Sequence, residues 1–113
     1  MSGSKVINWE DFKKVEIRVG KIVQVDYFPE ARKPAYKLMI DFGAIGMRCA
    51  SAQVTNYTRE ELEGRQVIAV VNFPPKQIGP FISEVLVLGA VEKDGVVTLV
   101  RPDPHSSLGA RIE

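Results

Sequence analysis

The chain has 113 residues, of which 45% are apolar and 26% are charged, and its formal net charge is +1. This composition predicts one globular domain spanning residues 1–113, large enough to bury roughly two-thirds of its unfolded surface. A near-neutral chain has no strong overall positive field, so any binding of nucleic acid must come from a local patch.

Few residues are available for catalysis or metal binding. The single cysteine, Cys49, excludes an internal disulfide, and the single histidine, His105, lies in a proline-rich tail. With no ligand-spaced cluster, no glycine-rich phosphate loop and no candidate nucleophile, we expect no metal, no cofactor, no catalytic residue and no enzyme activity. The absence of a long apolar run predicts a cytoplasmic protein without membrane insertion.

The first predicted element is a short helix over residues 9–14. Asn8 can cap it, and two acidic residues follow in the first turn. Trp9 and Phe12 are three residues apart and so share a face. We expect this face to cover one end of the core as a lid; a dimer contact through Trp9 is the alternative.

A long strand is predicted over residues 15–27, because apolar and polar residues alternate there. Gly20 interrupts the pattern and predicts a bulge or a sharp bend, which would let one strand serve both sides of a small barrel. Residues 28–34 then form a loop. Arg32 and Lys33 in this loop are either solvated charges or contacts for an anion.

Residues 36–42 show the clearest alternation in the chain and predict the second strand. A tight turn follows, and residues 47–53 return as the third strand. Residues 55–64 are predicted to be helical, because Thr58 and Glu61 have the spacing of a capping box.

Further strands are predicted over residues 67–71, 85–91 and 96–100, with an Asp94-Gly95 hairpin turn between the last two. Three strands, a helix and two more strands is the order of the OB-fold. The sequence therefore predicts an all-β protein with short helices. The predicted architecture is a five-stranded OB-fold barrel with its helix between strands three and four, plus one extra C-terminal strand.

The segment over residues 71–85 joins the fourth and fifth strands. Its three prolines predict that it is neither regular strand nor helix, yet it carries several large apolar side chains. It could be a binding surface, a packed underside that closes the core, or mainly a dimer interface together with Trp9 and the sixth strand. Because OB-folds bind ligands on this loop and on the loop after the first strand, we favour a binding role for both loops.

Four separated strings resemble the tRNA-binding domain family: VEIRVGKIVQV, YKLMIDFG, EELEGRQVIAVVNFPPKQIG and SEVLVLG. The strings FPEARKPAYKL and VVNFPPKQIGPFISEVLVLG are most similar to one branch, the CsaA proteins, which are described as export-related chaperones. The resemblance implies a non-catalytic OB-fold homodimer. It also implies either binding of unfolded or precursor polypeptides, with contact to the secretion machinery, or binding of structured RNA, chiefly tRNA.

The first hypothesis is a chaperone-like groove that buries apolar side chains of a peptide and hydrogen-bonds its backbone. The residues we predict for peptide binding are Tyr36, Asn72, Phe73, Gln77, Ile78, Phe81 and Ser83. Such binding should depend little on salt, and a homodimer would offer two sites to one long client.

The second hypothesis is a structure-specific tRNA-binding protein. The residues we predict for phosphate contacts are Arg18, Arg32, Lys33, Lys37, Arg48 and Lys76. Neighbouring aromatic side chains would stack on unpaired bases. This hypothesis predicts an affinity that falls steeply with salt.

Overall fold

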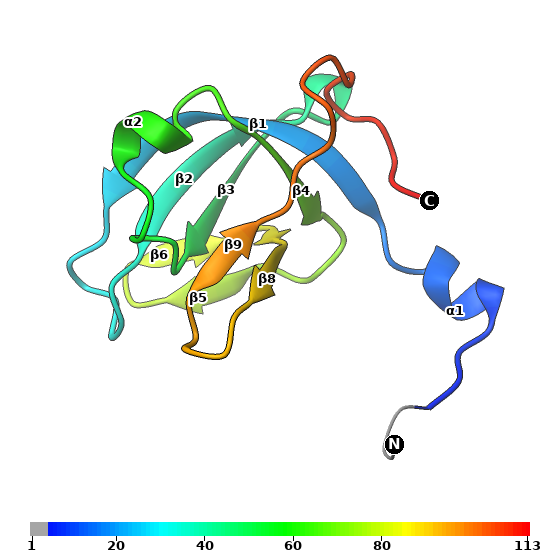
Figure 1. Cartoon of the computed structure of the whole chain (residues 1–113), viewed down its shortest axis with the longest axis horizontal. Helices are drawn as coiled ribbons and strands as arrows, with labels where there is room; N and C mark the ends of the chain where they lie inside the picture. The colour runs from blue at the N-terminus through cyan, green and yellow to red at the C-terminus, as the bar shows by residue number, and fades with distance from the viewer. Residues whose placement is uncertain (1–4) are drawn as a thin grey trace.

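A computed structural model describes residues 5–113 and shows a small barrel with short helices outside it (Figure 1). The helices are α1 (Trp9–Lys13), the 3-10 turn η1 (Gly43–Ile45) and α2 (Arg59–Leu62). The strands are β1 (Ile17–Tyr27), β2 (Tyr36–Asp41), β3 (Met47–Ala52), β4 (Gln66–Val70), β5 (Lys76–Ile78), β6 (Phe81–Ser83), β7 (Leu86–Val87), β8 (Gly89–Val91) and β9 (Val97–Leu99). No helix of this part of the chain is long and apolar enough to cross a membrane.

The main sheet has five antiparallel strands in the order β3-β2-β1-β4-β7, so the long strand β1 lies at its centre. The sheet curls until its two edges meet. The Glu84 N–H donates to the Cys49 carbonyl at 2.8 Å, and the Ser51 N–H donates to Ser83 Oγ at 3.0 Å. The result is a nearly closed five-stranded barrel, which confirms the predicted OB-fold.

Alternation along β2 builds the core, as predicted. Tyr36, Leu38 and Ile40 point inward and are buried, whereas the residues between them are only partly buried. Phe42 and Leu62 are also fully buried. Among residues 5–113 the buried set holds no charged side chain, so burial of apolar surface is what stabilises the barrel.

The bulge in β1 is not at Gly20, where we predicted a bulge or a bend. The register between β1 and β2 shifts between Ile22 and Gln24, so the extra residue is Val23. Gly20 lies earlier, in regular pairing with β4. A Cβ at Gly20 would lie 2.6 Å from Ile40 Cγ2 and 2.7 Å from Phe42 Cε1, so this glycine is required by close packing in the core rather than by a bulge.

The prediction that α1 forms a lid over the core is wrong. Asn8 caps the helix, as predicted, and Asp11 bonds back to the Asn8 N–H, but none of the helix residues is buried. Trp9 is 58% exposed, and the centre of its ring lies 5.6 Å from that of Phe12. The helix stands away from the barrel (Figure 1). The predicted second helix is shorter than residues 55–64, but its capping box between Thr58 and Glu61 is present.

The segment over residues 71–85 contains regular structure, contrary to the prediction. Strands β5 and β6 pair across a two-residue turn, Gly79-Pro80. Gly79 supplies a φ of +57°, and the proline falls in the turn, where it interrupts no ladder hydrogen bond. The predicted strand over residues 85–91 is also divided, into β7 and β8, while the β8–β9 hairpin confirms the predicted extra strand.

The C-terminal tail forms a contact that the sequence did not predict. Arg111 makes an isolated β-bridge with Arg18, and the Ile112 N–H donates to the Ile17 carbonyl at 2.9 Å. The tail therefore lies along the beginning of β1, and residues 13–18, the start of the 71–85 segment and the tail meet in one region.

Candidate functional site

The two loops that we predicted to carry function contact each other. Phe28, in the β1–β2 loop, packs edge-to-face on Phe81 of β6, with 5.5 Å between ring centroids. The ammonium group of Lys37 lies 5.6 Å from the centre of the Phe28 ring and 6.0 Å from that of Phe81. This contact anchors the β5–β6 hairpin against the outside of β2.

On its other side, the same hairpin forms one wall of an apolar groove of about 540 Å³. The floor and walls come from the end of β3, from the 71–85 segment, from β7 and from β9. The apolar lining residues are Ala52, Val54, Phe73, Pro74, Ile78, Val85, Leu86, Val87, Val97 and Leu99. Phe73 is 52% exposed and Leu86 is 48% exposed, so the groove offers large apolar side chains to a ligand.

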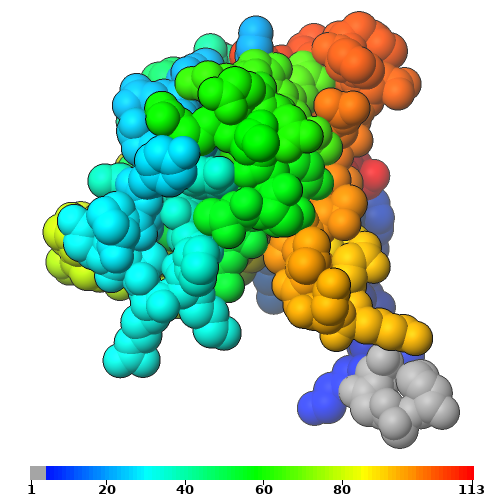
Figure 2. All heavy atoms as spheres, turned by 60° about the vertical axis from the view of Figure 1, so that its left-hand side comes forward, coloured from blue at the N-terminus to red at the C-terminus, as the bar shows by residue number. Residues whose placement is uncertain are grey.

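The β8–β9 hairpin that closes the groove is fixed to the barrel by two hydrogen bonds. The Asn56 amide donates to the Val97 carbonyl at 3.1 Å, and the Leu99 N–H donates to the Tyr57 hydroxyl at 3.0 Å. Figure 2 shows this hairpin, in orange, beside the green segment that joins β3 and β4. The wall formed by β9 is therefore held in place from the barrel side.

Two polar side chains at the groove, those of Ser83 and Glu84, bond within the protein. Ser83 Oγ accepts from the Ser51 N–H, and a carboxylate oxygen of Glu84 accepts from the Cys49 N–H at 2.9 Å. Burial, followed by the nearby Glu84, raises the pKa of the Cys49 thiol, which donates to the Ile82 carbonyl at 3.1 Å. Cys49 therefore joins β3 to the hairpin as a protonated thiol, and Lys76 brings a positive charge to the groove.

Of the residues predicted for peptide binding, Phe73, Ile78 and Ser83 line the groove. Tyr36 lies in the core, where its hydroxyl donates to the Tyr57 carbonyl at 2.8 Å. Phe81 faces the β1–β2 loop instead of the groove.

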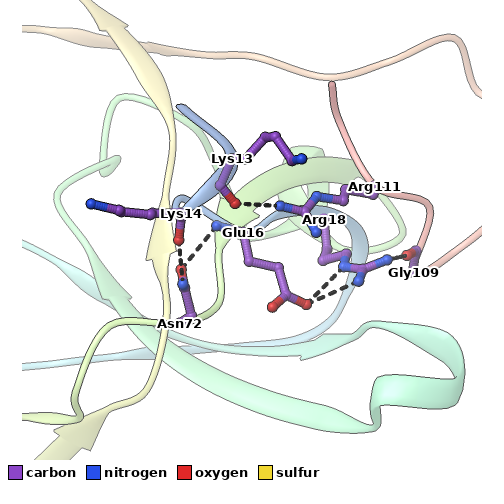
Figure 3. A network of polar contacts seen from close by, with 7 residues as sticks. All are labelled: Lys13, Lys14, Glu16, Arg18, Asn72, Gly109 and Arg111. Atoms are coloured by element: carbon purple, nitrogen blue, oxygen red, sulfur yellow. Dashed lines mark hydrogen bonds and ion pairs between the residues drawn. The ribbon is translucent and has the colours of Figure 1, made fainter. Parts of the chain in front are cut away.

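The two predicted amide side chains bind to the protein itself. Asn72 accepts from the Glu16 N–H at 2.9 Å and donates to the Lys14 carbonyl at 2.7 Å (Figure 3). Gln77 donates to the Gly79 carbonyl at 3.1 Å within its own hairpin. Asn72 thus ties the start of the 71–85 segment to the chain that enters β1.

The predicted basic residues lie in several places. Arg18 forms an ion pair with Glu16 at 3.0 Å and donates to the Gly109 carbonyl (Figure 3). Arg48 donates to the carbonyl of its neighbour Met47. Arg32 and Lys33 are exposed in the β1–β2 loop, whose neighbour Lys37 covers the aromatic contact, whereas Lys76 lies at the groove.

Residue-by-residue reasoning missed the contribution of the β7 and β9 side chains, Leu86, Val87, Val97 and Leu99. A signal was available, since residues 85–91 lack the polar alternation of a strand with one face in water. A metal site is a poor alternative, because within residues 5–113 no three His, Cys, Asp or Glu side chains gather closely enough to hold an ion.

The profile of a family described as "Putative tRNA binding domain" matches residues 17–111. Among solved structures, the CsaA chaperone protein of Picrophilus torridus is 56% identical, with a TM-score of 0.91, over 96% of this chain and 100% of that one. Chaperone CsaA of Bacillus anthracis is 46% identical with the same TM-score and the same coverage. A methionine–tRNA ligase of Methanococcus vannielii is 36% identical over 96% of this chain, but the match spans only 16% of the ligase.

Proposed function

The chain belongs to the putative tRNA-binding domain family, and from this premise we propose that it is a CsaA-like chaperone that binds unfolded or precursor polypeptides in the apolar groove. The observation that carries the proposal is the groove itself. It is open, it presents half-exposed Phe73 and Leu86, and it has the dimensions of a ligand pocket. Its action would be reversible burial of client side chains, with no bond made or broken.

Apolar recognition suits clients that share composition rather than sequence. A client side chain entering the groove would lose its contact with water against Phe73, Ile78 and the β7 and β9 side chains. The lining of the groove contains aromatic, branched aliphatic and proline side chains, so apolar client side chains of different shapes could bind there. Selection would therefore be for exposed apolar segments, which unfolded and precursor chains offer and folded proteins do not.

The proposal includes a homodimer in the cytoplasm. Val6 and Ile7, just before α1, and Trp9, its first residue, are exposed where α1 stands off the barrel, and a second copy would cover them. Two grooves on one dimer would gain affinity for a long chain through effective concentration. Binding precursors before export, with hand-over to the secretion machinery, is the role that we propose for this dimer.

A second candidate function, tRNA binding, is favoured by the family profile over residues 17–111. Arg32, Lys33 and Lys37 lie on or beside the β1–β2 loop, next to the aromatic pair Phe28 and Phe81. Phosphate contacts by these cations would release counterions, so tRNA affinity would fall steeply as salt rises.

The test is a pair of titrations on the purified protein. Fluorescence anisotropy would follow a labelled unfolded peptide and labelled total tRNA, each from low to high salt. Peptide binding that persists in high salt supports the groove. Tight tRNA binding with a steep salt slope, together with no peptide binding, would replace the chaperone proposal with the second function.

The dimer has its own test, sedimentation velocity on Trp9→Ser and Tyr27→Ser. Both residues are exposed aromatics, and only the first lies on α1. Dissociation of Trp9→Ser alone is expected. A monomeric wild-type protein would remove the avidity argument.

A further inference from the structure

A second, smaller pocket of about 160 Å³ lies where β1, the connection from α2 to β4, and the C-terminal segment meet. Its lining contains three cationic side chains, Lys21, Arg65 and Arg101, and no acidic one. The remaining lining residues are Gly64, Gln66 and Pro104. It shares no lining residue with the apolar groove, and it contains none of the cations that we predicted for RNA binding.

The backbone around this pocket is fixed. The Gly64 N–H donates to the Ile22 carbonyl at 2.8 Å, and the Ile22 N–H donates to the Arg65 carbonyl at 2.9 Å. Gln66 stands opposite Lys21 in the β1–β4 register, and its amide donates to the Ser106 carbonyl at 2.9 Å. These bonds hold the strand, the connection and the C-terminal segment together, so the pocket exists before any ligand arrives.

The guanidinium group of Arg65 is oriented by an aromatic ring. Its central carbon lies 5.0 Å from the centre of the Tyr57 ring, which restricts the plane of the group. Its buried Nε–H has no hydrogen-bond partner in the structure. A buried donor without an acceptor is costly, and Gln66 Oε1, in the same lining, is a buried acceptor without a donor, so the polar groups of this pocket are not satisfied within the protein.

The charges of the pocket are not balanced within the protein. Among residues 5–113, neither Lys21 nor either arginine has a carboxylate oxygen within 4.0 Å. The carboxylate opposite Lys21 in the β1–β2 register belongs to Asp41, and one of its oxygens accepts from the Gly43 N–H at 2.8 Å. Three cations facing one small volume repel one another, and an anion placed among them would remove that repulsion.

We propose that this pocket binds a phosphate group. A tetrahedral phosphate presents oxygens in several directions, which suits donors that come from three separate chain segments, whereas one planar carboxylate is satisfied by a single guanidinium. The phosphate would be either a phosphodiester of an RNA backbone or a free phosphate ion. The site goes beyond the apolar groove and does not depend on it.

The experiment is a titration of the full chain with inorganic phosphate, followed by NMR at the Gly64 amide and at the Arg65 Nε–H. We expect saturable shifts at both positions and binding about tenfold weaker, or more, in Lys21→Gln/Arg101→Gln, because two charged contacts are lost. Lys93→Gln, in the β8–β9 turn, is the control that removes a distant positive charge. Absence of shifts at both positions, equal weakening by the control, or equal shifts with a glutamate oligomer would overturn the proposal.

A second arm identifies the source of the phosphate. If it is RNA, the double variant should reduce the magnitude of the slope of log affinity for total tRNA against log salt by about 0.7–0.9, the contribution of one phosphate contact, while Lys93→Gln leaves the slope unchanged. If the slope is unchanged in the double variant but inorganic phosphate still shifts the wild-type resonances, the site is one for free phosphate. Peptide binding by the same variants should equal that of the wild type, so failure of the groove proposal would be seen separately.

Discussion

Replacement of Phe73 by alanine should weaken peptide binding about tenfold without unfolding the barrel. A phenylalanine side chain has roughly 200 Å² of surface, and Phe73 is 52% exposed, so about 100 Å² is available for a peptide to cover. At about 25 cal/mol per Å² this is at most about 2.5 kcal/mol, and covering half of it gives about 1.3 kcal/mol, or tenfold. By the same arithmetic the covered half of the ring contributes up to about 2.5 kcal/mol to folding, so peptide binding is compared under conditions in which the variant remains folded.

The assay is anisotropy of a labelled unfolded peptide in high salt, where charge effects are screened. Tyr27→Ala is the matched control, because Tyr27 is also an exposed aromatic, at 64%, and does not line the groove. Wild-type affinity in Phe73→Ala, or an equal loss in Tyr27→Ala, would refute the assignment of the groove as the peptide site.

Three further predictions concern how the site is held. Asn72→Ala should lower the free energy of unfolding, measured in urea, by about 1 kcal/mol, because two solvent-exposed hydrogen bonds to residues 14 and 16 are lost. The control Gln77→Ala, which loses one hydrogen bond within its own hairpin, should change this free energy by less than about 0.5 kcal/mol. Gly20→Ala should cost about 1–3 kcal/mol through overpacking, and a neutral result in thermal melts would contradict the packing described for β1. Burial and Glu84 raise the pKa of Cys49, so the free energy of unfolding should fall as pH rises above the ordinary thiol range, and iodoacetamide should alkylate the folded chain more slowly than the unfolded one. Equal alkylation rates for the folded and the unfolded chain would contradict the last prediction.

The parts of the fold that local sequence determines were predictable. The alternation of β2, the Asn8 cap of α1 and the capping box of α2 involve residues at most four apart, and all three are present in the structure. The β5–β6 hairpin was missed because prolines normally end strands. Here Pro75 stands just before β5 and Pro80 lies in the turn, where neither breaks a ladder.

The groove could be predicted only in part, because its lining comes from positions far apart in the chain. Val54, Phe73 and Val97 each read locally as an ordinary apolar residue, and only the closed barrel brings them to one cavity. The same limit explains Asn72, whose side chain suits ligand binding but bonds to residues 14 and 16. No local pattern indicates a partner more than fifty positions away.

The error over α1 has a functional consequence. Two aromatic residues on one helical face predict that the face is covered, and the sequence cannot distinguish a core from a partner. Because the structure leaves Trp9 exposed, this face is available for a second chain to cover. The exposed aromatic face of α1, which does not cover the core, therefore supports the proposed homodimer.

The chaperone and RNA readings of this family need not exclude each other on this barrel. The apolar groove is built on the 71–85 segment, β7 and β9, whereas the cationic pocket is built on β1, the α2–β4 connection and the C-terminal segment. The proposed binding in the groove would gain from released water and depend little on salt, whereas the proposed binding in the pocket would gain from charge and weaken with salt. Because the two surfaces share no lining residue, a peptide in the groove and a phosphate in the pocket could be bound at the same time. On this reasoning, saturating peptide in moderate salt should leave the affinity for phosphate unchanged, and mutual displacement would mean that the two surfaces are coupled through the barrel.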